Sequence, residues 1–154
     1  MKQSARAIVL KDGSLLLMKR FKMGQDYYTL LGGGIEQGEQ PEETVVREVK
    51  EESGLVIDSP RLVYIEDAGD PFGIQYVFLC NYVSGEPQLP KESEEAFWTT
   101  AGKNTYEPMW FPYEKLETIP FVSPLLKELL IRARQEGFPD KPFEFSSRHA
   151  ARVS

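Results

Sequence analysis

Three glutamates, Glu48, Glu51 and Glu52, are the residues whose spacing points most clearly to chemistry. Residues at i, i+3 and i+4 share one face of an α-helix, so these carboxylates would gather along one stripe. Like charges at this spacing repel one another, and a hard divalent cation offsets that repulsion. Mg²⁺ prefers carboxylate and water oxygens and commonly bridges to substrate phosphates. The spacing therefore predicts a Mg²⁺ site on this face, with Mn²⁺ as a substitute.

The helix that must carry these glutamates is expected over residues 40–53. Pro41 suits its first turn, two glutamates follow at the positive end of the helix dipole, and Gly54 is a natural stop. Arg47 lies on the same helix and can hold a neighbouring carboxylate through a charge-assisted hydrogen bond. Before the helix, the run Gly32-Gly33-Gly34 lets bare backbone approach a ligand and can offer a carbonyl to a metal ion.

From Gly33 to Leu55 these residues follow the pattern G-x5-E-x7-R-E-U-x-E-E-x-G-U, in which U is an aliphatic residue. A chance match at a given start is on the order of 10⁻⁹ at ordinary residue frequencies. A helix that is merely acidic on its solvated face would explain the three glutamates alone, but it does not explain the whole pattern.

This stretch resembles the Nudix box, and its flanks agree with the resemblance. Residues 28–31 resemble the aromatic-x-Leu-Pro segment before the box, although Leu31 stands where the family usually has proline. Residues 110–116 resemble the family's later Trp-x-Pro-Leu-x-x-Leu stretch. The resemblance implies an α/β fold, namely an α/β/α sandwich around a mixed β-sheet. It also implies substitution by water at a phosphorus of a pyrophosphate, with metal ions neutralising charge.

The resemblance assigns roles to individual box positions. Arg47 would orient a catalytic carboxylate, and Glu39 would brace the loop before the helix and contribute to substrate binding together with Gly34. The implied metal ligands are Glu48, Glu51 and Glu52, assisted by the carbonyl of Gly32 or Gly33.

The catalytic base is less settled in the family, and the sequence leaves several acids open. It is a box glutamate, Glu51 or Glu52, or an acid from a later part of the chain. Glu107 lies three residues before Trp110, where the family often has an acid, and Glu95 lies in a long loop. We weigh these two later acids equally, and simple solvated acidity is an alternative explanation for each.

The implied substrate is a nucleoside diphosphate linked to another moiety, such as a nucleoside triphosphate or a related nucleotide. Phe72 and Trp98 lie in expected loops, where an aromatic side chain could stack on a base. The alternative is a non-catalytic nucleotide-binding sensor that reuses the fold. A degenerate sensor would be expected to lose box glutamates, and every one of them is present. No motif identifies the particular nucleotide.

Composition limits the class of protein. The net charge of −6 and the pI of about 4.9 argue against binding to a nucleic-acid polymer, which needs a basic surface. We expect no membrane segment, because no apolar run approaches the length of a membrane-spanning helix. Cys80 is the only cysteine and is expected in the core, so a cytoplasmic enzyme without disulfides is favoured. Relatives often form homodimers, and this remains open here.

The remaining elements are expected around a single domain over residues 1–137, followed by a flexible tail over 138–154. Asp12-Gly13 between two apolar runs is a strong hairpin signal. A structureless connection is expected over 84–106, because this segment has little periodicity. Helical segments are expected at 113–116 and 124–134, and strands at 5–10, 15–19, 28–31, 55–57, 61–65, 74–83 and 109–111.

Overall fold

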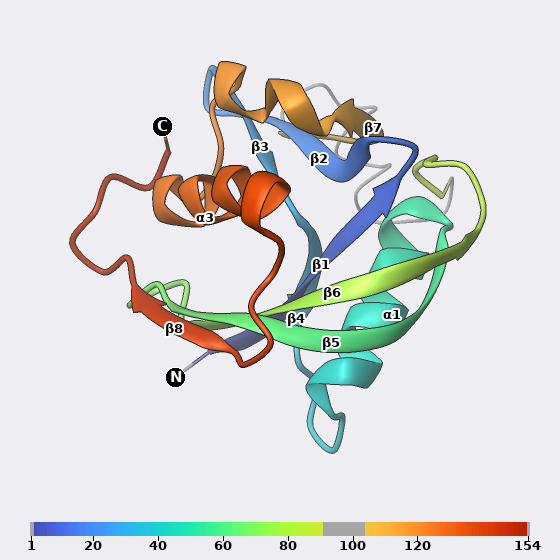
Figure 1. The fold of residues 1–154 in the computed structure, drawn as a ribbon, viewed down its shortest axis with the longest axis horizontal. Coiled ribbons are helices and arrows are strands. Elements are labelled where there is room, and N and C mark those ends of the chain that lie inside the picture. Colours follow the sequence, from blue (N-terminus) through green and yellow to red (C-terminus); the bar gives the residue numbers. More distant parts are fainter. Residues whose placement is uncertain (1, 91–103, 154) are drawn as a thin grey trace.

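The computed structural model describes residues 2–90 and 104–153 of the 154-residue chain. Figure 1 shows a twisted sheet with helices packed on it. In chain order the described elements are β1 (Gln3–Lys11), β2 (Ser14–Lys22), β3 (Gln25–Thr29), β4 (Leu31–Gly34), α1 (Pro41–Ser53), β5 (Val56–Asp67), β6 (Ile74–Ser84), β7 (Asn104–Pro112), the 3₁₀ helix η1 (Tyr113–Thr118), α3 (Pro124–Glu136) and β8 (Phe143–Ser146).

The sheet is mixed. Its main strand order is β3-β2-β1-β6-β5-β8, while β4 pairs with β1 and β7 pairs with β2. The pairs β1–β6 and β5–β8 are parallel, and the other described pairs are antiparallel. The predicted hairpin at Asp12-Gly13 is confirmed: Lys11 pairs with Ser14, and both turn residues have positive φ angles, of 50° and 77°.

Two hydrophobic cores lie on the two faces of this sheet, because successive side chains of a strand point to opposite faces. On β1, Ala7 and Val9 pack into the core that contains Val45 of α1. Ile8, between them, faces the other core, which contains Leu130 of α3. The sheet therefore separates α1 from α3, and the predicted α/β/α sandwich is confirmed.

Helix α1 has the ends that the sequence predicts. Its N-cap is Gln40, whose backbone N–H donates to the Glu43 carboxylate at 2.9 Å, and Pro41 is its first residue. Gly54 closes the helix with φ of 79°, a conformation that glycine adopts without strain. Val45 and Val49 are fully buried, so the apolar stripe of α1 rests on the sheet and leaves Arg47 and Glu51 near the solvent.

Three segments are more regular than the sequence suggests. β2 and β3 continue through most of 20–27, and β7 starts at Asn104, inside the expected structureless connection. These polar ends are held in strands by ladders with their neighbours, as when Lys22 pairs with both Gln25 and Asn104. Tertiary pairing here outweighs weak local strand propensity.

The C-terminal tail, expected to be flexible, contains strand β8, which the sequence analysis missed. β8 runs parallel to β5, with Tyr64 opposite Phe143, and Ser147 after it is buried. Alternation of Phe143 and Phe145 with polar residues is a strand signal too short to stand out in a polar segment. The division into one domain and a tail stays a prediction.

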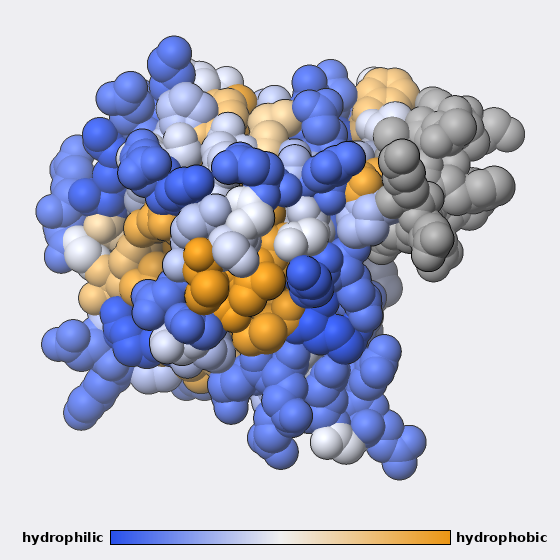
Figure 2. Space-filling view, turned by 90° about the vertical axis from the view of Figure 1, so that its right-hand side faces the viewer, coloured by the Kyte–Doolittle hydropathy of each residue, from blue (hydrophilic) through white to orange (hydrophobic). Residues whose placement is uncertain are grey.

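Cys80 is 5% exposed, which confirms its predicted place in the core. No helix in the described part of the chain is long and apolar enough to cross a membrane. Figure 2 shows one face of the molecule, on which hydrophilic side chains surround a central apolar area.

Candidate functional site

The site is built on β4, whose glycines bring bare backbone between β1 and α1. In the β1–β4 ladder, Gly32 pairs with Arg6 and Gly33 with Ala5. A Cβ on Gly32 would lie 2.0 Å from the Ala5 carbonyl oxygen, so a side chain cannot be accommodated there. A Cβ on Gly33 would lie 2.5 Å from Cδ of Glu48. The missing side chain of Gly33 is therefore the space in which the Glu48 carboxylate lies.

Glu52 joins α1 to the same strand. The Gly32 N–H donates to Glu52 Oε1 at 2.8 Å, and Glu52 is only 9% exposed. A carboxylate that accepts a backbone N–H is held in place by a charge-assisted hydrogen bond. One carboxylate of the predicted trio is thus fastened to the glycine strand.

Arg47 lies at the centre of the acidic residues. Its Nε donates to Glu39 Oε2 at 2.7 Å and its Nη2 to Glu39 Oε1 at 3.1 Å, which is a bidentate pair. Its Nη1 donates to Glu48 Oε1 at 3.1 Å and to Glu51 Oε2 at 3.2 Å. Its Nη2 also lies 3.4 Å from the Gly34 carbonyl oxygen. A single guanidinium thus positions three carboxylates and one carbonyl.

These bonds change the acidity of Arg47 and Glu39. The Arg47 hydrogen bond is the largest cause that lowers the pKa of Glu39 to about 2, and a bond from Thr44 Oγ1 at 2.6 Å adds to it. The same Glu39 bond raises the pKa of Arg47. Both groups are therefore charged at neutral pH, and the loop before α1 is tied to the helix by a full ion pair.

The pKa of Glu48 is shifted in the opposite direction from that of Glu39. Burial raises the pKa of its carboxyl, and the nearby Arg47 opposes that rise. Its side chain is 17% exposed, whereas the side chain of Glu51 is 58% exposed. A partly buried carboxylate of this kind is stabilised in its charged form by a cation.

The fit of these residues to a divalent metal can be judged from their donor atoms. In residues 2–90 and 104–153, no three acidic, histidine or cysteine side chains already lie in an arrangement that could hold a metal ion. Glu48 and Glu51 turn instead toward Arg47. Both side chains can swing from the guanidinium by rotation about their side-chain bonds. The donors are all carboxylate or carbonyl oxygens, which fit Mg²⁺ or Mn²⁺ and not a soft metal.

The remaining predicted site residues are more scattered. Gly34 is exposed beside Arg47, and Phe72 is 40% exposed in the loop between β5 and β6. Glu107 is exposed on β7, where it pairs with Lys19 of β2. Glu95 and Trp98 lie outside the described residues.

Sequence reasoning missed a polar cluster next to the box. Arg6 donates from Nη1 to the Gly32 carbonyl oxygen at 3.1 Å and from Nε to Gln75 Oε1 at 3.0 Å. Burial lowers the pKa of this guanidinium, and Glu52 and Glu48 oppose that effect. The sequence did contain a signal for this cluster, because Arg6 lies inside an apolar strand. Charged residues are almost never buried without a partner, so a buried polar partner could have been expected.

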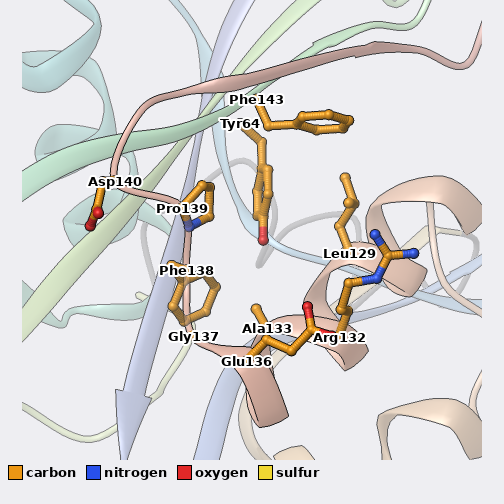
Figure 3. A pocket seen from close by; sticks show the side chains of 10 residues that line it. All are labelled: Tyr64, Leu129, Arg132, Ala133, Glu136, Gly137, Phe138, Pro139, Asp140 and Phe143. Carbon is orange, nitrogen blue, oxygen red and sulfur yellow. The ribbon is translucent and has the colours of Figure 1, made fainter.

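Figure 3 shows a different cavity of about 350 Å³ between the end of α3, β5 and residues 137–143, with Tyr64 at its centre. No predicted site residue lines this cavity. The box chemistry must therefore be sought elsewhere.

Comparison with known proteins agrees with this geometry. A model of the NUDIX domain matches residues 1–131. The NAD-capped RNA hydrolase NudC of Enterobacter sp. (strain 638) is 36% identical over 91 residues, which are 58% of this chain and 35% of that protein. The chain thus matches about a third of the length of these curated relatives.

Solved structures share the fold. The mutator MutT protein from Bacillus halodurans has a TM-score of 0.66 at 21% identity, with 99% of this chain and 94% of that chain covered. The MutT NUDIX hydrolase from Burkholderia pseudomallei has a TM-score of 0.56 at 25% identity, with 73% and 84% covered.

A mixed sheet between two helical layers, with a glutamate-rich helix packed against a glycine strand, is the arrangement of the Nudix fold. The chain belongs to the Nudix hydrolase family.

Proposed function

We propose that this enzyme uses a divalent metal, Mg²⁺ or Mn²⁺, to hydrolyse the pyrophosphate bond of a nucleoside diphosphate linked to another moiety. The observation that carries the proposal is the position of the Glu48 carboxylate in the space left by Gly33, one helical turn from Glu52, which is fastened to Gly32. This arrangement places two partly desolvated carboxylates beside backbone that a phosphate can approach.

In this proposal Glu48, Glu51 and Glu52 hold the metal, and the carbonyl of Gly32 or Gly33 assists. Bound metal would neutralise the charge that develops on the phosphoryl oxygens. Arg47 keeps the glutamates from repelling one another and releases Glu48 and Glu51 to the metal, while its two bonds to Glu39 keep the guanidinium in place. Arg47 is thus a positioning residue.

The reaction needs a base to remove a proton from the attacking water as the new phosphorus–oxygen bond forms and the bridging one breaks. Of the box acids, Glu51 is more open to water than Glu52. Glu107 and Glu95 remain the later candidates. Comparing Glu51→Gln, Glu52→Gln, Glu95→Gln and Glu107→Gln by the pH dependence of kcat would separate them, because loss of the base removes its ionisation from the profile.

The substrate class is supported by the curated relatives, whose names specify NAD-capped RNA. NAD contains a nucleoside diphosphate joined to a second nucleoside, which is the proposed type of substrate. The match covers only part of those proteins, so free NAD enters the panel as one compound to be tested and not as an assignment.

The test is a screen with Mg²⁺ of nucleoside triphosphates including oxidised bases, ADP-ribose, dinucleoside polyphosphates, nucleotide sugars and NAD, with products separated by chromatography. We expect hydrolysis of at least one substrate at its pyrophosphate bond, and loss of hydrolysis when EDTA removes the metal. Measurable nucleotide binding with background hydrolysis across the whole panel would contradict the proposal and indicate a nucleotide sensor.

A further inference from the structure

A small cavity lies directly beside the candidate site, on the other side of Gly32. It has a volume of about 50 Å³. Gly32 connects it to the box, because its N–H binds Glu52 while its carbonyl oxygen accepts from Arg6. The cavity is lined by Arg6, Thr29, Leu30, Glu66, Gln75, Val122, Leu126 and Arg152.

The inner wall of this cavity is polar and well satisfied. Glu66 is 2% exposed and accepts hydrogen bonds from the hydroxyls of Ser123 and Ser147. Gln75 is also buried, with its amide N–H₂ donating to the Phe72 carbonyl oxygen at 2.8 Å and its oxygen accepting from Arg6. These buried polar groups are therefore fixed in position by bonds within the protein.

The C-terminal tail contributes Arg152 to the lining of this cavity. After β8, the tail is fastened at two adjacent residues: the Ser147 N–H donates to the Asp67 carbonyl oxygen at 2.9 Å, and Arg148 Nε lies 2.8 Å from Asp67 Oδ2. The chain then turns from β8 toward α3 (Figure 1), and Arg152 reaches the cavity. We call residues 149–153 the strap.

The contacts of Arg152 are longer than those of Ser147 and Arg148, the two residues that anchor the tail to Asp67. Its guanidinium carbon lies 4.1 Å from the centroid of the Phe72 ring, and its Nη1 is 3.9 Å from Glu66 Oε2. Its Nε is buried and has no hydrogen-bond partner among the residues that the structure describes. Glu66 already accepts from two hydroxyls, and Arg152 makes no hydrogen bond to it at 3.9 Å.

Arg152 leaves little room beside Phe72. Pockets for small molecules usually measure about 300–1,000 Å³, far more than the cavity left under Arg152. The face of Phe72 that could stack on a nucleobase is covered by the planar guanidinium. If Arg152 served only to bind a nucleobase, the structure should have space for that base next to the guanidinium.

We propose that the strap is autoinhibitory: the small cavity is the base-binding end of the nucleotide cleft, and Arg152 fills it and must leave before a nucleobase can stack on Phe72. This inference rests on the proposed function, since it concerns the same substrate. The strap lowers apparent affinity by keeping only a fraction of the molecules open, and the apparent Kd rises in inverse proportion to that fraction. The Ser147–Arg148 anchor keeps the released strap close to the cleft.

The test compares the full-length chain with Arg152→Ala. A matched control is Arg134→Ala, which removes the same charge and an ion pair of the same length, 3.9 Å to Glu114, away from the cleft. KM and kcat are measured on the best substrate of the screen. A strap closed in nine molecules of ten predicts that Arg152→Ala lowers KM about tenfold with kcat little changed, while Arg134→Ala changes neither.

A second readout does not depend on turnover. Hydrogen exchange of the amides in residues 149–153 is followed with and without a nucleotide analogue whose bridging oxygen is a methylene group. Faster exchange with the analogue supports displacement of the strap. Slower exchange, or a higher KM for Arg152→Ala, would overturn the proposal and make Arg152 a substrate contact.

The outcomes also separate this inference from the proposed function. Hydrolysis with the same KM in all three proteins would refute the strap and leave the proposed function intact. Neither binding nor hydrolysis of any panel nucleotide by the full-length chain and both variants would refute the proposed function, and the strap with it.

Discussion

Replacing Gly33 with alanine should damage the site while leaving the fold in place. The new Cβ would lie 2.5 Å from Glu48 Cδ, whereas ordinary contact begins near 3.4 Å, so the carboxylate must move by about 0.9 Å. A misplacement of about 1 Å can reduce the rate about 10²-fold, and we expect a loss of that size in kcat/KM. The atoms displaced are the end of a flexible side chain, so the free energy of unfolding should change by less than about 1 kcal/mol.

Gly34→Ala is a closely matched control for this prediction. Gly34 is the next residue of β4, and a Cβ there meets no atom within 4 Å. Both variants are assayed for hydrolysis of the screened substrate with Mg²⁺ and for thermal unfolding. Equal kcat/KM for the two variants would refute the argument that the missing side chain of Gly33 makes room for a working carboxylate.

Three further predictions follow from individual contacts. Arg47→Met removes the bond that holds the pKa of Glu39 at about 2, below its ordinary 4.5. Because ionised Glu39 stabilises the fold, the Tm of the wild type should exceed that of the variant by its full amount near pH 7, and the difference should fade as the pH falls from 4.5 to 2. A Tm difference that stays constant with pH would contradict this. Mg²⁺ at about 100 times its Kd should stabilise the wild type by about 2.7 kcal/mol, and Glu48→Gln should lose most of that gain in a thermal unfolding assay; an undiminished gain would argue against Glu48 as a ligand. Burial raises the pKa of Cys80 to about 12, so a thiol reagent at pH 8 should label the native protein only as fast as it opens; complete labelling within seconds would contradict the burial.

Much of the fold could be predicted because its signals are local. The Asp12-Gly13 turn specifies a two-residue hairpin, and Gln40 to Gly54 carries the start and stop of α1 in consecutive residues. The box glutamates could be placed on one helical face because helix geometry alone fixes the spacing of Glu48 and Glu52.

The parts that escaped prediction depend on contacts between distant segments. β8 is a strand because β5 offers it a partner, and nothing near Phe143 specifies that pairing. Arg6 is nearly 70 residues from Gln75, and only the parallel pairing of β1 with β6 brings them together. Within the box, the sequence predicted that Arg47 holds one carboxylate, whereas the structure gives it hydrogen bonds to three.

The most direct test of the central claim, that carboxylates of α1 drive cleavage of a nucleotide pyrophosphate, is the turnover of Glu52→Gln on the substrate found in the screen. The amide oxygen of glutamine can still accept the Gly32 N–H, so the link between α1 and β4 should survive and Tm should stay close to that of the wild type. Only the negative charge is removed. The account predicts a fall in kcat/KM of about 10²–10⁴-fold with Mg²⁺, and full turnover by this variant would contradict it.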